Sequence, residues 1–328
     1  MALTVFSSFS QDVQFSQFYA VPTHLNPAFA GSAHMSRGIF HQRVQWPALD
    51  ARYITSLAST DFWFQEYRSG VGIYAMQDFQ GQNNISSTDI HVQYAYEIPV
   101  NDLLTIRTGL QGGYVSRTLN YSRMTFPDQF TNDGLSPGSV SQDMLPNGRN
   151  QFVDIGSGVM LYNDNFWFGY SALHMNRPNQ SFLDGVSRLP VKHAFVAGYK
   201  FLLNHSKYNS SVYKTRPFSI TPTVHYKFQG KSDQVDLGVY ALYDQVIAGV
   251  WYRGIPVKQY LPDLHNNESM VVLFGYKFDN ISISYSYDFV VSRLSRARAA
   301  GAHELNITYL HKRKNRKKPM KRLPCPSF

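Results

Sequence analysis

The side chains of this 328-residue sequence that could support catalysis or metal binding match none of the common active-site spacings. GxSxG, P-loop, HExxH and dinucleotide-binding motifs are absent, so the familiar nucleophile, phosphate and zinc sites have no support. The run 132–134 (NDG) lacks the spaced acids and the closing glutamate of a calcium loop, which favours a turn. We therefore predict no enzyme activity, with no catalytic residue, no cofactor and no metal ligand.

Eleven histidines are spread along the chain, and four of them fall in segments with strand periodicity: His91, His193, His225 and His303. An isolated imidazole in such a strand more often faces a lumen or an interface than a metal. A serine and a histidine that meet only in space could still form a hydrolytic site. A barrel hydrolase is therefore a third, weaker alternative.

Cysteine and charge exclude further classes of site. The single cysteine, Cys325, excludes an intramolecular disulfide and a cysteine-rich metal site. The basic tail, residues 312–328, carries eight lysines and arginines and no acid, so the body of this +9 chain is close to neutral. We therefore predict no nucleic-acid partner. The tail is interpreted as a solvated extension, a docking arm for an acidic partner or a clamp on anionic lipid headgroups.

The composition is unusual for a soluble domain. Only 16% of the residues are charged, against roughly 25% in soluble domains, and 15% are aromatic. No run reaches the roughly eighteen apolar residues of a membrane-spanning helix. Residues 1–10 resemble the apolar core and cleavage end of a signal peptide, and we expect a remnant of one there; an ordinary first strand is the alternative.

Residues 36–311 alternate between apolar and polar side chains with a period of two, the pattern of strands with unlike faces. In 281–289, isoleucine, tyrosine and phenylalanine alternate with serine and aspartate. This periodicity predicts about fourteen strands, most of them roughly the nine to eleven residues that a tilted strand needs to cross a bilayer. Their expected ranges are 36–46, 50–60, 69–78, 86–97, 103–115, 151–162, 165–173, 191–202, 217–228, 233–243, 246–253, 268–278, 281–290 and 302–311.

The connections between these strands alternate in length. After even-numbered strands they are mostly tight, as at 163–164 and 244–245, with 203–216 as the exception. After odd-numbered strands the long, polar connections are 116–150, 174–190, 254–267 and 291–301. A transmembrane barrel with short periplasmic turns and long outer loops produces this parity, and an even strand count puts both termini on the periplasmic side.

Aromatic side chains gather near the predicted strand ends, which is typical of the interfacial girdles of membrane barrels. They are Trp46, Phe62, Trp63, Phe64, Phe166, Trp167, Phe168, Trp251, Tyr252 and Tyr260. The sequence thus predicts an all-β fold, a transmembrane antiparallel β-barrel in the outer membrane. A soluble sandwich or lipocalin-like barrel is the alternative, although such a protein should carry more surface charge.

A segment that does not alternate precedes the first predicted strand and contains two motifs. The first, QFSQFY, comprises Gln14, Phe15, Ser16, Gln17, Phe18 and Tyr19. The second, LNPAFAG, comprises Leu25, Asn26, Pro27, Ala28, Phe29, Ala30 and Gly31. With these motifs and the RLPCP run at 322–326, the chain resembles the PorP/SprF family of the type IX secretion and gliding system of Bacteroidota. The resemblance spans essentially the whole chain, and the N-terminal motifs are its most specific part.

This resemblance implies an outer-membrane β-barrel that accompanies type IX secretion. Some members of the family belong to the trans-envelope core assembly, whereas others serve particular adhesins of gliding motility and help to secrete them or hold them at the cell surface. The implied partners are the C-terminal domain of a secreted adhesin or other cargo, other secretion components and outer-membrane lipid. The choice between core component and adhesin partner stays open.

The N-terminal segment also has a physical rationale. Asn26-Pro27 favours a turn, because the residue before proline is pushed out of the helical region and asparagine makes local hydrogen bonds. Gly31 can turn the chain where a Cβ would clash. A compact, buried aromatic cluster is predicted from Phe15, Phe18, Tyr19 and Phe29. We expect residues 11–35 to dock into the periplasmic mouth or the lumen as a partial plug; a simple lead-in to the first strand is the alternative.

The predicted organisation is a signal-peptide remnant, a motif segment at the periplasmic end, a barrel and a basic tail, at 1–10, 11–35, 36–311 and 312–328. The predicted function is cargo binding through the loops 116–150 and 174–190. Candidate aromatic anchors are Tyr114, Tyr121, Phe126, Phe130 and Phe182. A general diffusion porin or small-solute channel is the alternative, because small or polar side chains are expected to face the lumen, among them Ser282, Ser284, Ser286, Thr221 and Thr223.

Overall fold

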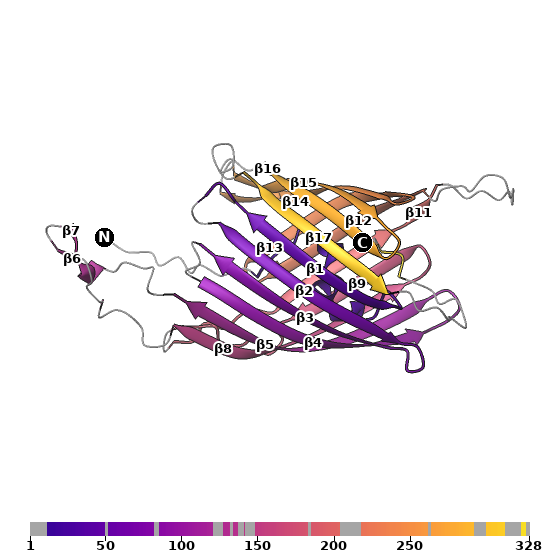
Figure 1. The fold of residues 1–328 in the computed structure, drawn as a ribbon, viewed down its shortest axis with the longest axis horizontal. Helices are drawn as coiled ribbons and strands as arrows, with labels where there is room; N and C mark the ends of the chain where they lie inside the picture. Colours follow the sequence, from indigo (N-terminus) through magenta and orange to yellow (C-terminus); the bar gives the residue numbers. More distant parts are fainter. Residues whose placement is uncertain are drawn as a thin grey trace.

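The computed structural model describes residues 12–49, 52–81, 85–120, 127–131, 134–136, 141, 148–182, 185–203, 218–261, 264–291, 300–311 and 323–325. Fourteen antiparallel strands close into one barrel, as the sequence predicts (Figure 1). They are β1 (Ser36–Gln45), β2 (Tyr53–Phe64), β3 (Ser69–Gln80), β4 (Ile85–Pro99), β5 (Thr105–Leu119), β8 (Arg149–Tyr162), β9 (Phe166–Leu173), β10 (Lys192–Tyr199), β12 (Phe218–Gln229), β13 (Ser232–Tyr243), β14 (Val246–Leu261), β15 (Leu264–Lys277), β16 (Ile281–Val290) and β17 (Ala302–His311).

The ring closes because β1 pairs with both β2 and β17, and β10 pairs with both β9 and β12. A two-residue strand, β11 (Phe201–Leu202), extends the ladder on β12. A small hairpin of β6 (Phe130–Thr131) and β7 (Gly134–Leu135) follows η4 (Pro127–Gln129) and projects beyond one end of the barrel (Figure 1).

The two ends of the barrel differ in their connections, as the parity of lengths predicts. The long-loop end carries the connections from β5 to β8, from β9 to β10 and from β16 to β17, whereas the short-turn end carries 65–68, 100–104, 163–165, 244–245 and 278–280. The tight turn 230–231 at the long-loop end departs from the parity, and the expected exception, 203–216, lies almost entirely outside the described residues. One expected long loop, 254–267, is instead mostly paired, because β14 and β15 extend to within two residues of each other. Register shifts in this extension interrupt the alternation from which a strand is recognised.

Burial is inverted relative to a soluble protein. In β16, Ser282, Ser284 and Ser286 are at most 5% exposed, whereas Ile281 and Ile283 are 42% and 39% exposed. Polar side chains therefore face the lumen and apolar ones face outward, which is the arrangement of a membrane barrel. The apolar outer face and polar lumen exclude a soluble sandwich and a lipocalin-like barrel.

The aromatic girdle expected from the sequence is correct for one face of the strands and wrong for the other. Exposed rings on the outer surface include Phe62, Phe64 and Phe168. In contrast, the indole rings of Trp63, Trp167 and Trp251 point inward and are at most 9% exposed. Successive side chains of a strand point to opposite faces, so a run of consecutive aromatics divides between membrane and lumen.

The N-terminal segment, residues 12–35, lies inside the barrel and includes η1 (Phe18–Ala20), α1 (Pro22–Leu25) and η2 (Pro27–Phe29). Asp12 contacts His174 and Lys192 at the long-loop end, whereas Gly31 lies against Asp61 toward the short-turn end. The segment therefore runs along the lumen, one of the two places expected for it, and extends beyond the short-turn end to the long-loop end. Among the described helices, none has the length and hydropathy that a membrane span requires.

The first and last described parts of the chain lie at opposite ends of the barrel, whereas both termini were expected on the periplasmic side. Leu323 packs into the core of the lumen, and Cys325 lines a small cavity with Lys200 and Lys277 at the short-turn end. An even number of strands puts the start of β1 and the end of β17 at the same end of the barrel. It does not fix the residues before β1, which are numerous enough to cross the lumen and reach the opposite end.

Candidate functional site

The QFSQFY motif is held by the carboxylate of Glu304, an inward-facing residue of β17. The backbone N–H groups of Ser16 and Gln17 donate to Glu304 Oε1 and Oε2 at 2.6 and 2.8 Å. All three residues are at most 1% exposed. One carboxylate therefore satisfies two buried N–H groups of an irregular segment, but its own charge requires a cation nearby.

Arg43 of β1 supplies this cation. Its Nη1 atom contacts Glu304 and lies 3.0 Å from Asp288 Oδ2, and it donates to Ser16 Oγ at 2.8 Å. Ser16 Oγ in turn donates to Asp288 Oδ2 at 2.5 Å. Arg253 Nη1 lies 3.5 Å from the same carboxylate. The first motif is thus built into an ion network that joins β1, β14, β16 and β17.

The Gln17 amide binds the serines that line β16. Its Nε2 atom donates to Ser286 Oγ and to the backbone carbonyl oxygen of Glu304, both at 3.1 Å, and its Oε1 atom accepts from Ser284 Oγ at 2.7 Å. These serines were also expected in the lining of a channel. In the structure, Ser284 and Ser286 instead bind the N-terminal segment.

The four motif aromatics are buried as predicted, but in two clusters. One cluster contains Phe18, Tyr19 and Phe29 and packs against Trp167, Tyr240 and Trp251. The other contains Phe15 and packs against Val21, Ile39, Leu57, Tyr74 and Met76. Burial raises the pKa of Tyr19 well above its ordinary value, so its hydroxyl stays neutral and accepts from Trp167 Nε1 at 3.2 Å.

The LNPAFAG motif forms the predicted turn. Asn26 is extended, with φ −161°, and its Oδ1 atom accepts from Ala28 N at 2.8 Å. Its Nδ2 atom donates to the carbonyl oxygen of Tyr170 at 3.0 Å. Gly31 has φ +71°, where an added Cβ would lie 2.7 Å from Gly70 Cα, so the need for glycine is confirmed.

Arg107 of β5 binds the carbonyl groups of this second motif. Its Nε atom donates to Ala28 O at 3.0 Å and its Nη2 atom to Ala30 O at 2.6 Å. Its Nη1 atom donates to Glu97 Oε2 at 2.6 Å. The fully buried Arg107 also lies over the Trp63 ring, 5.0 Å from its centroid. The planar fork of arginine suits this set of acceptors, and a lysine ammonium could not reach them together.

A second ion pair fixes the end of the motif. Arg37 of β1 binds Asp61 of β2 through two contacts, Nε–Oδ1 at 2.8 Å and Nη2–Oδ2 at 3.1 Å. Asp61 Oδ2 also accepts from Gly31 N at 2.8 Å. The chain is therefore tied to the barrel wall immediately before it enters β1.

Glycines in the barrel wall make room for the second motif. An added Cβ at Gly109 of β5 would lie 2.4 Å from Ala28 N, and one at Gly70 of β3 would lie 1.9 Å from Ala30 O. Real Cβ atoms do not approach backbone atoms this closely. The wall and the motif thus fit each other at backbone level, which only glycine permits.

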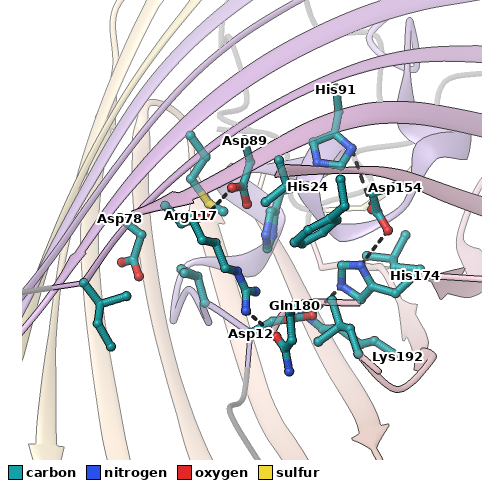
Figure 2. A pocket seen from close by; sticks show the side chains of 18 of the residues that line it. Asp12, His24, Asp78, Asp89, His91, Arg117, Asp154, His174, Gln180 and Lys192 are labelled. Carbon is teal, nitrogen blue, oxygen red and sulfur yellow. Dashed lines mark hydrogen bonds and ion pairs between the residues drawn. The ribbon is translucent and has the colours of Figure 1, made fainter. Parts of the chain in front are cut away.

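A cavity of about 320 Å³, here called the vestibule, lies at the long-loop end beside the first residues of the segment (Figure 2). A second cavity of about 340 Å³ adjoins it across Asp12 and Asp78. Deeper cavities along the segment and at the short-turn end measure only about 30 and 40 Å³. Labelled side chains of the vestibule are Asp12, His24, Asp78, Asp89, His91, Arg117, Asp154, His174, Gln180 and Lys192.

His174, which follows β9, ties Asp12 to the wall of the vestibule. Its Nε2 and Nδ1 atoms lie 2.7 Å from Asp12 Oδ2 and from Asp154 Oδ1, and Lys192 Nζ lies 3.5 Å from Asp12 Oδ2. Burial opposes the charged form of His174, but the two carboxylates raise its pKa to about 9. Burial likewise opposes the charged form of Asp12, yet the cations hold its pKa well below the ordinary value. Both groups are therefore charged near neutral pH.

Comparison with known proteins identifies the family. Residues 7–309 match the family described as "Type IX secretion system membrane protein PorP/SprF". The chain belongs to the PorP/SprF family. No curated protein matches this PorP/SprF member.

Solved structures with low similarity include outer membrane protein Omp33 of Acinetobacter baumannii, at 8% identity and TM-score 0.43, with 84% of this chain and 98% of that chain covered. The toluene transporter TbuX of Ralstonia pickettii is 12% identical with TM-score 0.49, covering 89% of this PorP/SprF chain and 94% of its own.

The candidate partner-binding residues of this PorP/SprF protein lie in different places. Tyr114 projects outward from β5 and is 44% exposed, and Phe130 is 54% exposed on the β6–β7 hairpin. Phe182 lines the vestibule. Tyr121 and Phe126 lie outside the described residues. The structure therefore does not bring Tyr114, Phe130 and Phe182 into one surface, and the role of all five aromatics stays a prediction.

The scattered histidines of this PorP/SprF protein also divide between the two faces. His91 and His225 are buried toward the lumen, whereas His193 and His303 accept or donate at tyrosine hydroxyls of neighbouring strands. Within the described part of the chain, no three His, Cys, Asp or Glu side chains are arranged to hold a metal.

The charged residues that hold the motifs were not singled out from the sequence. They are Arg37, Arg43, Asp61, Glu97, Arg107, Asp288 and Glu304. A usable signal existed, because each of these charges stands on the inward face of its strand, and most other residues on that face are small or polar. In a chain with few charges, an arginine or carboxylate inside a strand indicates a buried partner.

Proposed function

We propose that this PorP/SprF protein is a non-enzymatic outer-membrane scaffold that binds a type IX cargo, such as the C-terminal domain of a surface adhesin, and helps to secrete or anchor it. The observation that carries this proposal is the filled lumen. Residues 15–30 are almost entirely buried and bonded to charged groups from several strands, so the family motifs are used to close the barrel. A closed barrel acts through its surfaces.

The long-loop end is the proposed cargo side. The short turns would then lie in the periplasm, as in other membrane barrels, and the long loops outside, where a displayed protein is reached. The hairpin that carries Phe130 projects from this end, and the vestibule with Phe182 opens between the same loops (Figure 1). Aromatic side chains at exposed loops are typical anchors of protein interfaces.

Affinity purification from native outer membranes in mild detergent, followed by mass spectrometry, tests this function. A large surface adhesin should co-purify, and Phe130→Asp should reduce its recovery at least severalfold. Leu103→Asp, at a 73% exposed position of the short-turn end, is the matched control and should leave recovery unchanged. Recovery of periplasmic ring and lipoprotein components instead would assign the protein to the core secretion machine. A barrel recovered alone, with steady conductance, would contradict the proposal.

A diffusion channel for small solutes is the second candidate. It is favoured by the polar inner wall and by the two cavities at the long-loop end, which together extend inward to Arg43 and His91. The much smaller cavities deeper in the barrel oppose it. Single-channel recording in planar bilayers separates the candidates, because an open pore gives steady steps and a closed scaffold gives none.

A further inference from the structure

The vestibule contains more negative than positive charge. Its described lining includes four carboxylates, from Asp12, Asp78, Asp89 and Asp154, and the cationic groups of Arg117, Lys192 and His174. Two of the carboxylates, Asp12 and Asp154, are paired with His174 or Lys192 as described above. The other two lie on the neighbouring strands β3 and β4, two register positions apart, since Asp78 pairs with Ser87 and Met76 pairs with Asp89 (Figure 2).

Neutral groups are the hydrogen-bond donors of these two carboxylates. Asp78 accepts from Thr55 Oγ1 at 2.6 Å and from Gln80 Nε2 at 2.7 Å. Asp89 accepts from Ser87 Oγ at 2.5 Å. Hydroxyl and amide donors satisfy oxygen lone pairs but bring no positive charge. Two carboxylates with neutral donors in one cavity create a negative potential that attracts a cation.

The guanidinium of Arg117 is the remaining positive group; it acts electrostatically on both Asp89 and Asp12, although its hydrogen bond goes to another residue. Its Nη1 atom donates to Gln180 and its Cζ atom lies 5.7 Å from the centroid of the Phe152 ring. It offsets one negative charge of the vestibule at most. With His174 protonated, the lining retains an excess of one carboxylate.

A second, independent feature also indicates a ligand. His91 Nδ1 and Asp154 Oδ2 are buried, line the same cavity and make no hydrogen bond. The two atoms lie 3.9 Å apart, too far for a hydrogen bond between them. Buried polar atoms without such partners are costly, and a polar ligand in the vestibule would supply them.

Part of the remaining wall is apolar and suits an aliphatic chain, beside polar residues such as Gln111 and Gln180. The apolar part is formed by Tyr74 and Met76 of β3, Leu173 of β9 and Phe182. Its volume of about 320 Å³ exceeds that of a single long side chain and lies at the lower limit of ligand pockets. Lysine and arginine combine an apolar stem with a charged head, so they match a cavity with an apolar wall and an acidic edge.

We propose that the vestibule binds a lysine or arginine side chain of a partner polypeptide, with the cationic head at Asp78 and Asp89 and the stem along the apolar wall. This inference rests on the proposed function for the identity of the partner, the secreted cargo. The cation preference of the cavity itself is a property of the purified barrel and does not depend on that identity.

The test measures the charge preference of a thiol placed in the vestibule. In a Cys325→Ala background, Ile85→Cys puts a thiol on β4 at the cavity lining, and Leu103→Cys provides an exposed reference thiol at the opposite end. Both are reacted with a trimethylammonium-ethyl and a sulfonato-ethyl methanethiosulfonate. Relative to the reference, the cationic reagent should react roughly tenfold faster than the anionic one in the vestibule. Ser187→Cys, on the loop side of the same cavity, replaces Ile85→Cys if that variant fails to fold.

Two controls complete the test. Asp78→Asn with Asp89→Asn should abolish the charge preference, whereas Asp102→Asn in an exposed short turn should not. Nα-acetyl-lysine methylamide at high millimolar concentration should slow labelling, and its uncharged norleucine analogue should not. Equal rates for both reagents, a preference that survives the asparagine variants, or equal protection by both analogues would overturn the inference. Cargo recovery from native membranes is a separate readout, so failure of the proposed function is distinguishable from failure of this one.

Discussion

Asn26 and Gly158 are in contact in the lumen: a Cβ on Gly158 would lie 2.0 Å from Asn26 Oδ1. Asn26 belongs to the second family motif, and Gly158 lies on β8 in the barrel wall. Because Gly158 has no side chain, Asn26 can approach the wall at this point. Together with Gly70 and Gly109, Gly158 makes the barrel complementary to one N-terminal segment. The segment and the barrel wall therefore act as one folded unit.

Overpacking this contact should destabilise the protein. Gly109→Ala forces a Cβ against the backbone of Ala28, and we expect a loss of about 1–3 kcal/mol in the free energy of unfolding. Gly112→Ala is the matched control, since it lies on the same strand with no atom within 4 Å of the added Cβ. Urea unfolding of the detergent-solubilised protein measures both. Equal stability of the two variants would contradict the packing described here.

Neutralising Glu304 should loosen the first motif. Glu304→Gln leaves Arg43 facing fewer charges and replaces one acceptor of the Ser16 and Gln17 N–H groups by a donor, so we expect a cost of roughly 3–5 kcal/mol. Glu66→Gln, in an exposed turn, is the control. A double-mutant cycle with Arg43→Met should show strong coupling between Arg43 and Glu304. Additive effects would rule out the ion network as a unit.

The contact between Asp12 and His174 should make stability depend on pH. The pKa of His174 is raised to about 9 from 6.5, so its contribution is complete below about pH 6.5 and is lost as pH rises through 9. The pKa of Asp12 is lowered, so its contribution is lost only in acid, below its ordinary value of 3.8. The difference in Tm between the wild type and His174→Gln should be largest between about pH 4 and 6.5 and shrink toward pH 10. A difference that grows with pH would exclude this contact as its source.

Removing the N-terminal segment should open the barrel. We expect the intact protein to give no steady conductance in planar bilayers and a chain lacking residues 12–35 to give open steps. The deleted chain is first tested for folding by heat-modifiable migration in gels, and Gly109→Ala provides a full-length protein with a displaced segment. Steady conductance of the folded wild type would favour the channel.

The thiol of Cys325 should resist alkylation in the folded protein. Burial raises its pKa to about 12, so it stays protonated at neutral pH. We expect labelling by N-ethylmaleimide at pH 7 to be at least tenfold slower than for an added thiol in Leu103→Cys, and the two rates to become equal in denaturant. Equal rates in the native protein would show that residues 323–325 do not stay in the lumen.

The barrel was predictable because a membrane imposes a local rule. Every strand must place apolar residues on one face and satisfy its backbone in a closed ring, so a period of two in segments of suitable length determines fold and approximate strand count. The turn at Asn26-Pro27 and the requirement for Gly31 were likewise local, since each depends on neighbouring backbone alone.

The tertiary structure alone decided what the barrel contains. The N–H of Ser16 meets a carboxylate 288 residues away in Glu304, and no spacing in the sequence connects them. Register and pleat decided that Trp63 faces the lumen while Phe62 faces outward. The N-terminal segment lies along the lumen because inward charges bind it at both ends and wall glycines make room for residues 26–31. These contacts join residues that become neighbours only when the ring closes, so local patterns can mark an inward charge but not its partner.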